Sequence, residues 1–237
     1  MKNLIIASAL FFLSISLGLS QNTADKLRIS YIGNSASDFI TNTVKKQVSD
    51  ENELSYVLYL MTESKVYYSL YIDSKNNSSF FSLDSTRILP GVTTSGYFHT
   101  VVKNSEQTYG MEYFMDSEVE FSGNIDELEW EFTNESKTIL GYECKKANLT
   151  NAPGYYAWFA TKLPFNDGPG FYKGLPGLVL EVNTPFEFIT TASIEPISKE
   201  EFPDQNQIAS VSDKNSTTIE AMFAKKDNFR RTIIAGK

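Results

Sequence analysis

Most of this chain is built from short segments in which apolar and polar residues alternate, and this pattern restricts the fold more than any other feature. Alternation with a period of two places apolar side chains on one face of a β-strand. The spacers at 74–77, 134–137 and 183–185 are short, and short spacers join antiparallel neighbours because parallel strands need a long crossover. We predict strands at residues 27–32, 54–61, 65–73, 97–103, 108–115, 119–121, 127–133, 138–148, 155–162, 178–183 and 186–194.

The expected fold is therefore mainly β: a curved antiparallel meander sheet, or an open half-barrel, over residues 21–197. A hydrophobic content of 41% is enough for a packed core. Thr217 and Glu220 have the spacing of a capping box, which predicts a C-terminal helix within 215–237 that packs on the sheet. Residues 37–47 form a second helical candidate.

The two remaining segments are not expected to belong to the sheet. Residues 1–20 combine Lys2 with the almost entirely apolar or small run 4–19, which is typical of a cleaved secretory signal. Residues 198–214 are polar and are expected to be a linker. The protein should thus be exported to the periplasm, the outer envelope or the medium, with no transmembrane span after signal cleavage.

Composition excludes several classes of function. A net charge of -8 and a pI near 4.8 argue against nucleic acid as a partner. The single Cys, Cys144, leaves no internal disulfide, and together with the single His, His99, it removes most metal sites and most His-based nucleophilic catalysis. We therefore expect no cofactor, no metal site and no catalytic set.

Four Pro-Gly pairs punctuate the chain. Proline presets φ at the first corner of a type II turn and glycine accepts the positive φ of the second, so each pair is expected to turn the chain at a sheet corner. The structural turn positions are Pro90 and Gly91, Pro153 and Gly154, Pro169 and Gly170, and Pro176 and Gly177, with Gly174 shortly before the last pair.

An ordered set of motifs resembles a known family. After Trp130 come Ile139-Leu-Gly-Tyr-Glu-Cys144 and Ala157-Trp-Phe-Ala-Thr161, and then Gly174-Leu-Pro-Gly-Leu-Val179. This order is similar to that of the GLPGLI family of secreted or envelope proteins from Gram-negative bacteria, with Val179 in place of the final Ile. The likeness covers residues 130–194. It implies an exported bacterial protein with a β-rich fold, and it implies no reaction.

Three further features have both a structural and a functional interpretation. Cys144 lies on the apolar side of its strand, where a buried hydrophobe is the ordinary role. His99 lies between aromatic residues of a strand. Acidic residues alternate with apolar ones at Glu118, Glu120, Glu127, Glu129 and Glu131, which is typical of a solvated strand face. A carboxylate pair for glycoside hydrolysis or a hard-cation site is the functional alternative.

The candidate ligand-binding residues are Tyr156, Trp158, Tyr172 and Lys173. The run 155–159 is apolar on both strand faces, so it is either doubly buried or lines a cleft. Lys173 lies between two Pro-Gly pairs, where it is either an exposed loop charge or a ligand contact, because loops on rigid scaffolds commonly bind. Aromatic residues beside a rigid turn would suit a sugar or a peptide side chain.

The sequence favours an exported, non-enzymatic binding or envelope-accessory module of unknown specific activity. Its partner is expected to be an envelope protein, a glycan or an apolar ligand. One alternative is a carboxylate-dependent hydrolase that acts on envelope glycan or peptide through Glu118, Glu129 or Glu131. Another is a structural assembly partner whose edge strands pair with an envelope protein.

Overall fold

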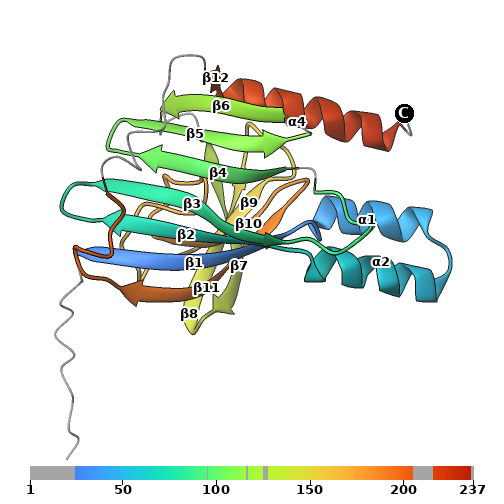
Figure 1. Ribbon diagram of the computed structural model, residues 1–237, viewed down its shortest axis with the longest axis horizontal. Helices are drawn as coiled ribbons and strands as arrows, with labels where there is room; N and C mark the ends of the chain where they lie inside the picture. Colours follow the sequence, from blue (N-terminus) through green and yellow to red (C-terminus); the bar gives the residue numbers. More distant parts are fainter. Residues whose placement is uncertain (1–24, 95, 116, 125–127, 205–215, 236–237) are drawn as a thin grey trace, which may run out of the picture.

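The computed structural model describes residues 25–94, 96–115, 117–124, 128–204 and 216–235, and within them twelve strands form one sheet (Figure 1). The helices are α1 (Asp38–Gln47), α2 (Glu51–Glu63) and α4 (Ile219–Ile234). The strands are β1 (Lys26–Asn34), β2 (Lys65–Asp73), β3 (Ser78–Arg87), β4 (Gly96–Lys103), β5 (Gln107–Phe114), β6 (Ser117–Asn124), β7 (Trp130–Ile139), β8 (Tyr142–Leu149), β9 (Tyr156–Ala160), β10 (Leu178–Asn183), β11 (Phe188–Pro196) and β12 (Thr217–Thr218).

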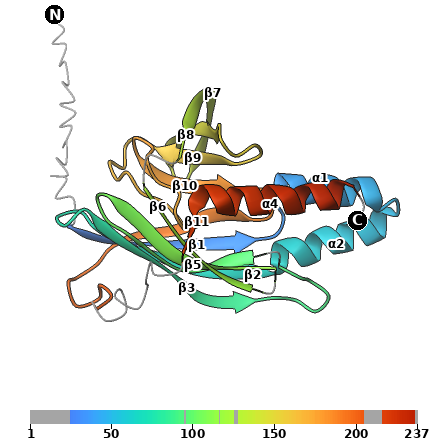
Figure 2. The same ribbon diagram turned by 90° about the horizontal axis from the view of Figure 1, so that it is seen from above.

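The sheet consists of two antiparallel meanders joined side by side. Its strand order is β12-β6-β5-β4-β3-β2-β1-β11-β10-β9-β8-β7. Strands β1 to β6 form one meander and β7 to β11 the other, and β1 pairs with β11 to join them. Seen from above, the sheet is curved, with β8 and β9 on one side of α4 and β3 on the other (Figure 2). The predicted mainly-β fold, a curved open sheet with a C-terminal helix, is confirmed.

Alternation explains why the strands bury one face. In β1 every second residue is buried, so Leu27, Ile29 and Tyr31 face the interior. The Tyr31 hydroxyl donates a hydrogen bond to the carbonyl of Val179 (2.7 Å), which ties β1 to the start of β10. Aromatic rings fill much of the space between the two meanders, and they meet mostly edge to face.

Helix α4 packs across the concave side and contacts both meanders (Figure 2). Thr218 is its N-cap, accepting a hydrogen bond from the Ala221 amide (3.1 Å). Phe223 contacts Tyr155 near the start of β9, with ring centroids 5.1 Å apart. On the other side, Lys226 forms an ion pair with Glu112 of β5 (2.6 Å). The predicted helix therefore holds the two halves of the sheet together.

No helix in the described ranges is long and apolar enough to cross a membrane.

The structure corrects one predicted strand and one predicted turn. Residues 54–61 lie in α2, because the Asp50 side chain caps the helix by accepting from the Glu53 amide (2.8 Å) and the apolar residues also recur at helical spacing. The predicted spacer 134–137 lies inside β7, and the chain reverses at Leu140 and Gly141, which have φ values of +48° and +81°.

Other segments complete the comparison with the expected elements. The helical candidate at 37–47 is α1, with Ser37 as its N-cap. Strand β3 was not predicted, because its second half is polar and exposed. The expected signal at 1–20 lies outside the described residues, as does 205–214 of the expected linker.

Two of the Pro-Gly pairs have the geometry of a turn closed by a hydrogen bond between its first and fourth residues. Gly91 has a φ of +86°, and the Val92 amide donates to the Leu89 carbonyl (3.2 Å). Gly154 has a φ of +88°, and the Tyr155 amide, next along the chain, donates to the Ala152 carbonyl (3.2 Å). These positions have the expected positive φ at glycine.

The other two pairs turn the chain differently from the expectation of a type II turn. At Pro169 the closing bond runs from the Tyr172 amide to the Pro169 carbonyl (3.1 Å), because the Gly168 carbonyl instead accepts from the ammonium of Lys103 (2.6 Å). At Pro176 the Gly177 amide donates to the Leu175 carbonyl (2.8 Å), which closes a three-residue turn.

Gly177 occupies the most restricted of these corners. It has a φ of +156°, and a Cβ atom there would lie 2.3 Å from the Ala160 carbonyl oxygen. Backbone atoms of a paired strand cannot yield as a flexible side chain can. At Gly91 a Cβ atom would meet nothing within 4 Å. Gly177 of the hexapeptide at residues 174–179 is therefore required by a close backbone approach.

We predict that Gly177→Ala lowers the free energy of unfolding by about 3 kcal/mol or more, since it adds a backbone clash to the strain of an unfavourable φ. Gly91→Ala is the matched control, and its cost should be about 1 kcal/mol because only the φ strain applies. Urea denaturation of both variants measures the difference. Equal costs would show that the approach to Ala160 does not constrain the turn.

Candidate functional site

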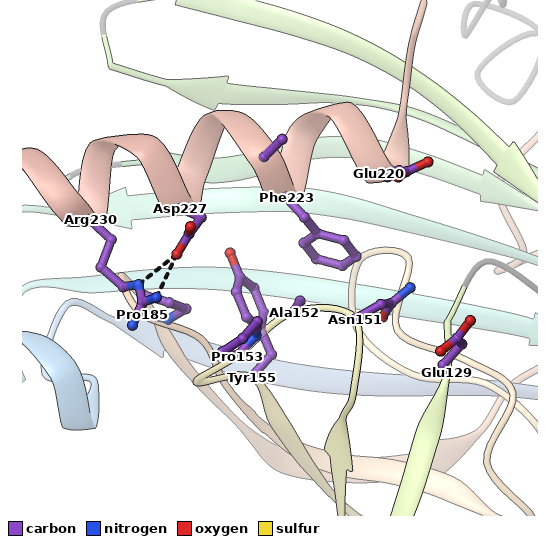
Figure 3. A pocket seen from close by; sticks show the side chains of 11 residues that line it. Glu129, Asn151, Ala152, Pro153, Tyr155, Pro185, Glu220, Phe223, Asp227 and Arg230 are labelled. Atoms are coloured by element: carbon purple, nitrogen blue, oxygen red, sulfur yellow. Dashed lines mark hydrogen bonds and ion pairs between the residues drawn. The ribbon is translucent and has the colours of Figure 1, made fainter.

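A cleft of about 440 Å³ lies between α4 and the turn that joins β8 to β9 (Figure 3). We call it the α4 cleft. It combines aromatic rings, carboxylates, an amide and a guanidinium. Its lining residues are Glu129, Asn151, Ala152, Pro153, Tyr155, Pro185, Glu220, Phe223, Ala224, Asp227 and Arg230.

The Pro153-Gly154 turn positions Tyr155 under α4. The Tyr155 ring packs against Phe223, and its hydroxyl points toward the helix between Phe223 and Asp227 (Figure 3). Only 5% of Tyr155 is exposed, and its buried hydroxyl has no hydrogen-bond partner among the described residues. Burial raises the pKa of this hydroxyl far above its usual value, so it remains a neutral donor.

The polar side of the cleft is held in place by ion pairs on α4. Asp227 accepts from Arg230 Nη2 (2.5 Å) and from Arg231 Nε (2.7 Å), and these hydrogen bonds lower the pKa of Asp227. Glu129 accepts from the hydroxyl of Thr150 (3.1 Å). A site with an apolar wall and a few fixed polar groups can orient a ligand that has both an apolar face and hydroxyl groups.

Tyr156 and Trp158 lie together on the other side of β9, away from the α4 cleft. Lysine side chains cover their rings: Lys146 Nζ is 4.5 Å from the ring centroid of Tyr156, and Lys137 Nζ is 4.5 Å from that of Trp158. The Tyr156 hydroxyl donates to Asp38 of α1 (2.8 Å). Both rings thus already have cationic partners from the chain itself.

Tyr172 and Lys173 are placed elsewhere. Tyr172 is fully buried in the core, where its ring meets Phe98 edge to face. Lys173 is also buried, which is contrary to its interpretation as an exposed loop charge, and its ammonium donates to the Asn104 carbonyl (2.9 Å). Of the four predicted ligand residues, the structure brings only Tyr156 and Trp158 onto a common face.

The structure also places Cys144, His99 and the alternating acidic residues. Cys144 is a free, fully buried thiol, and burial raises its pKa, so it is a core residue as expected. His99 is exposed, with its ring nitrogen 3.1 Å from the Thr100 hydroxyl. Glu118 lies in β6, near one end of the sheet order, whereas Glu131 lies in β7 at the other end. The described residues contain no group of three His, Cys, Asp or Glu side chains able to hold a metal ion.

Residues 70–226 match a known family, whose description is "N-glycanase peptide, N-terminal domain". The match covers more than half of the chain. The chain belongs to this family. It is a β-rich protein related to a domain of an N-glycanase. No curated protein matches the chain.

Solved structures give more distant likenesses. Two crystal forms of PNGF-II, in space groups P21 and C2, are each 16% identical, with TM-scores of 0.46 and 0.47 over 82% and 86% of this chain. They are matched over 31% and 32% of their own length, so this chain spans about a third of PNGF-II. An uncharacterized conserved protein from Thermus thermophilus is 5% identical, with a TM-score of 0.35, over 84% of this chain and 91% of that one.

The protein also contains a buried polar cluster that the sequence did not reveal. Glu187 accepts a hydrogen bond from the Tyr68 hydroxyl (2.7 Å), and the Lys226–Glu112 ion pair lies beside it around a small shared cavity. Burial raises the pKa of Glu187 to about 8. Glu187 directly follows the turn at Thr184–Phe186, and no motif marks it, because its partners come from β2, β5 and α4.

Glu187 should make stability depend on pH. The carboxyl has its usual pKa of 4.5 in the unfolded chain and about 8 in the folded one, so the folded state binds more protons between these values. Its contribution to the unfolding free energy therefore falls as pH rises through this window, by up to about 1.4 kcal/mol per pH unit. Glu187→Gln cannot titrate and should flatten the profile between pH 5 and 8 in urea denaturation.

The exposed residue Glu106 gives a matched control. Glu106→Gln should leave the pH profile of the wild-type protein unchanged. A Glu187→Gln profile parallel to the wild-type curve would show that Glu187 is ionised throughout this range.

Proposed function

We propose that this protein is a non-enzymatic module that binds glycans in the α4 cleft. The Tyr155 hydroxyl is the observation that carries the proposal. A buried hydroxyl without a partner costs roughly 1–3 kcal/mol, and a ligand hydroxyl placed in the cleft would remove that cost. Family membership supports a sugar ligand, since the family is described by an N-glycanase.

The other cleft residues fit the same chemistry. The ring of Phe223 offers an apolar wall for the C–H face of a sugar (Figure 3). Asp227 and Arg230 are fixed by their ion pair and present planar polar groups that match pairs of hydroxyls. Because these side chains are held before a ligand arrives, little rotamer entropy is lost on binding.

Export to the cell envelope or the medium is part of the proposal. It rests on the signal-like residues 1–20 and on the resemblance to the GLPGLI family. In that setting an envelope-accessory role follows, with a glycan or a glycosylated envelope protein as the partner. A carboxylate-dependent hydrolase is the second candidate, because Glu129 and Glu220 line the same cleft.

Binding of N-glycans and envelope glycans to the purified protein tests the proposal. Tyr155→Phe removes only the hydroxyl, and we expect it to weaken glycan binding about tenfold, the value of one hydrogen bond, without lowering the free energy of unfolding. Tyr156→Phe is the matched control, since that hydroxyl bonds to Asp38 on another face. It should leave the affinity unchanged.

Three results would overturn this assignment. One is the failure of every glycan to bind, and another is full affinity in Tyr155→Phe. The third is release of sugar from the glycans, abolished by Glu129→Gln or Glu220→Gln, which would make the hydrolase the correct function.

A further inference from the structure

A second pocket, of about 240 Å³, lies at the end of the sheet away from α1 and α2. It is formed by the β2–β3 turn, the β4–β5 turn, the segment 164–167 and Lys173. The two turns lie together at the left of Figure 1. We call it the turn pocket. Its lining is mainly polar and includes two lysines and two aspartates, so the balance of their charges determines what it can bind.

Three of these charges already have partners. Asp73 forms an ion pair with Lys26. Lys103, only 1% exposed, has all three ammonium hydrogens occupied: by the carboxylate of Asp167 (2.5 Å) and by the carbonyls of Gly168 (2.6 Å) and Gly170 (2.8 Å). Lys103 and Asp167 therefore neutralise each other and are needed to hold the Gly168–Gly170 segment.

Lys173 is the fourth charged residue of the turn pocket, and its charge is not compensated by an ion pair among the described residues. It is 5% exposed, and its ammonium donates to the Asn104 carbonyl (2.9 Å) but forms no ion pair with a carboxylate in the described part of the chain. Burial and the neighbouring Lys103 ammonium lower the pKa of Lys173. A buried ammonium with one carbonyl partner is costly, and a bound anion would offset that cost.

Ser79 provides a second, independent sign of a ligand. It is 3% exposed and lines the turn pocket, and its buried hydroxyl has no hydrogen-bond partner among the described residues. Ser79 on β3 is directly paired with Lys103 on β4. Directly paired residues project to the same face of a sheet, so the Ser79 side chain lies beside that of Lys103, and both line the turn pocket together with Lys173. The pocket thus contains an ammonium whose one described acceptor is the Asn104 carbonyl and a hydroxyl that has no described partner.

The backbone around Lys173 is fixed on both sides. Trp130 Nε1 donates to the Lys173 carbonyl (2.9 Å), and the amide of the next residue, Gly174, donates to Asn166 Oδ1 (2.5 Å). Lys173 immediately precedes the hexapeptide at residues 174–179, whose Gly177 corner lies close against the backbone of Ala160. The ammonium is therefore held in position before any ligand binds.

We propose that the turn pocket binds the carboxylate of a small, singly charged acidic ligand through the Lys173 ammonium and the Ser79 hydroxyl. A singly charged anion matches the one uncompensated ammonium. A doubly charged phosphate would bring one negative charge more than the pocket can compensate, because Asp73 and Asp167 are already paired with Lys26 and Lys103. This site has its own residues and does not depend on glycan binding in the α4 cleft.

Glucuronate, glucose and glucose 6-phosphate test the proposal, because they differ mainly in one group: a carboxylate, a hydroxymethyl or a phosphate ester. The indole N–H of Trp130 reports on the pocket in ¹H–¹⁵N NMR spectra, since it bonds to the Lys173 carbonyl. Trp158→Phe assigns the two indole signals. We expect glucuronate to shift the Trp130 signal in a saturable way, and glucose not to shift it.

Substitutions at Lys173 and Ser79 distinguish a loss of ligand binding from a loss of folding. Lys173→Met keeps the length of the buried stem, and it should reduce glucuronate affinity at least tenfold with a cooperative thermal transition retained. Ser79→Ala removes only an unpartnered hydroxyl and should reduce affinity several-fold without loss of stability. Lys162→Met, at an exposed lysine, is the matched control and should bind as the wild type does.

Equal responses to glucuronate and glucose would overturn the carboxylate assignment, and tighter binding of glucose 6-phosphate would overturn the single-charge argument. Wild-type affinity in both Lys173→Met and Ser79→Ala would overturn the site itself. If Lys173→Met fails to fold, the affinity of Ser79→Ala for glucuronate alone tests the site, and wild-type affinity in that variant would overturn it.

Discussion

The antiparallel pairing of β1 with β11 is the interaction on which the rest of the structure depends. It joins two meanders that are otherwise separate along the chain, and the Tyr31 hydroxyl strengthens the junction by its bond to the Val179 carbonyl. Once joined, the curved sheet encloses an aromatic core whose open side α4 covers. Both pockets described above lie where this closure brings distant segments together: one beneath α4, the other at the turns around Lys173.

Polar groups inside such a core need specific reasons to be there. The Lys103–Asp167 pair has a structural one, because its ammonium also holds the carbonyls of Gly168 and Gly170. The Tyr155 and Ser79 hydroxyls have no such reason within the described structure, and each lines a pocket. Unsatisfied donors at pocket walls, rather than the aromatic surface of β9, are therefore the features on which both binding proposals rest.

The sequence was informative where a local pattern decides the structure, and uninformative where a distant contact does. Alternation with a period of two predicted most strands. The apolar residues of 54–61 fit both the strand period of two and the helical period of about 3.6, and the N-cap at Asp50 favours the helix that forms there. Lys173 could be singled out because it lies between Pro-Gly pairs. Its burial could not be predicted, nor could the pairing of Ser79 with Lys103, because both depend on contacts between segments far apart in the sequence.

The junction of β1 with β11 also has a kinetic consequence. Strand β1 begins the described chain, yet its partner on one side is separated from it by nine intervening strands. Closing so long a loop costs chain entropy before any contact compensates for it, and topologies dominated by distant pairings fold slowly. We therefore expect pairing within each meander to precede the junction, and the interior between them, with its buried Glu187 and Lys103, to form last.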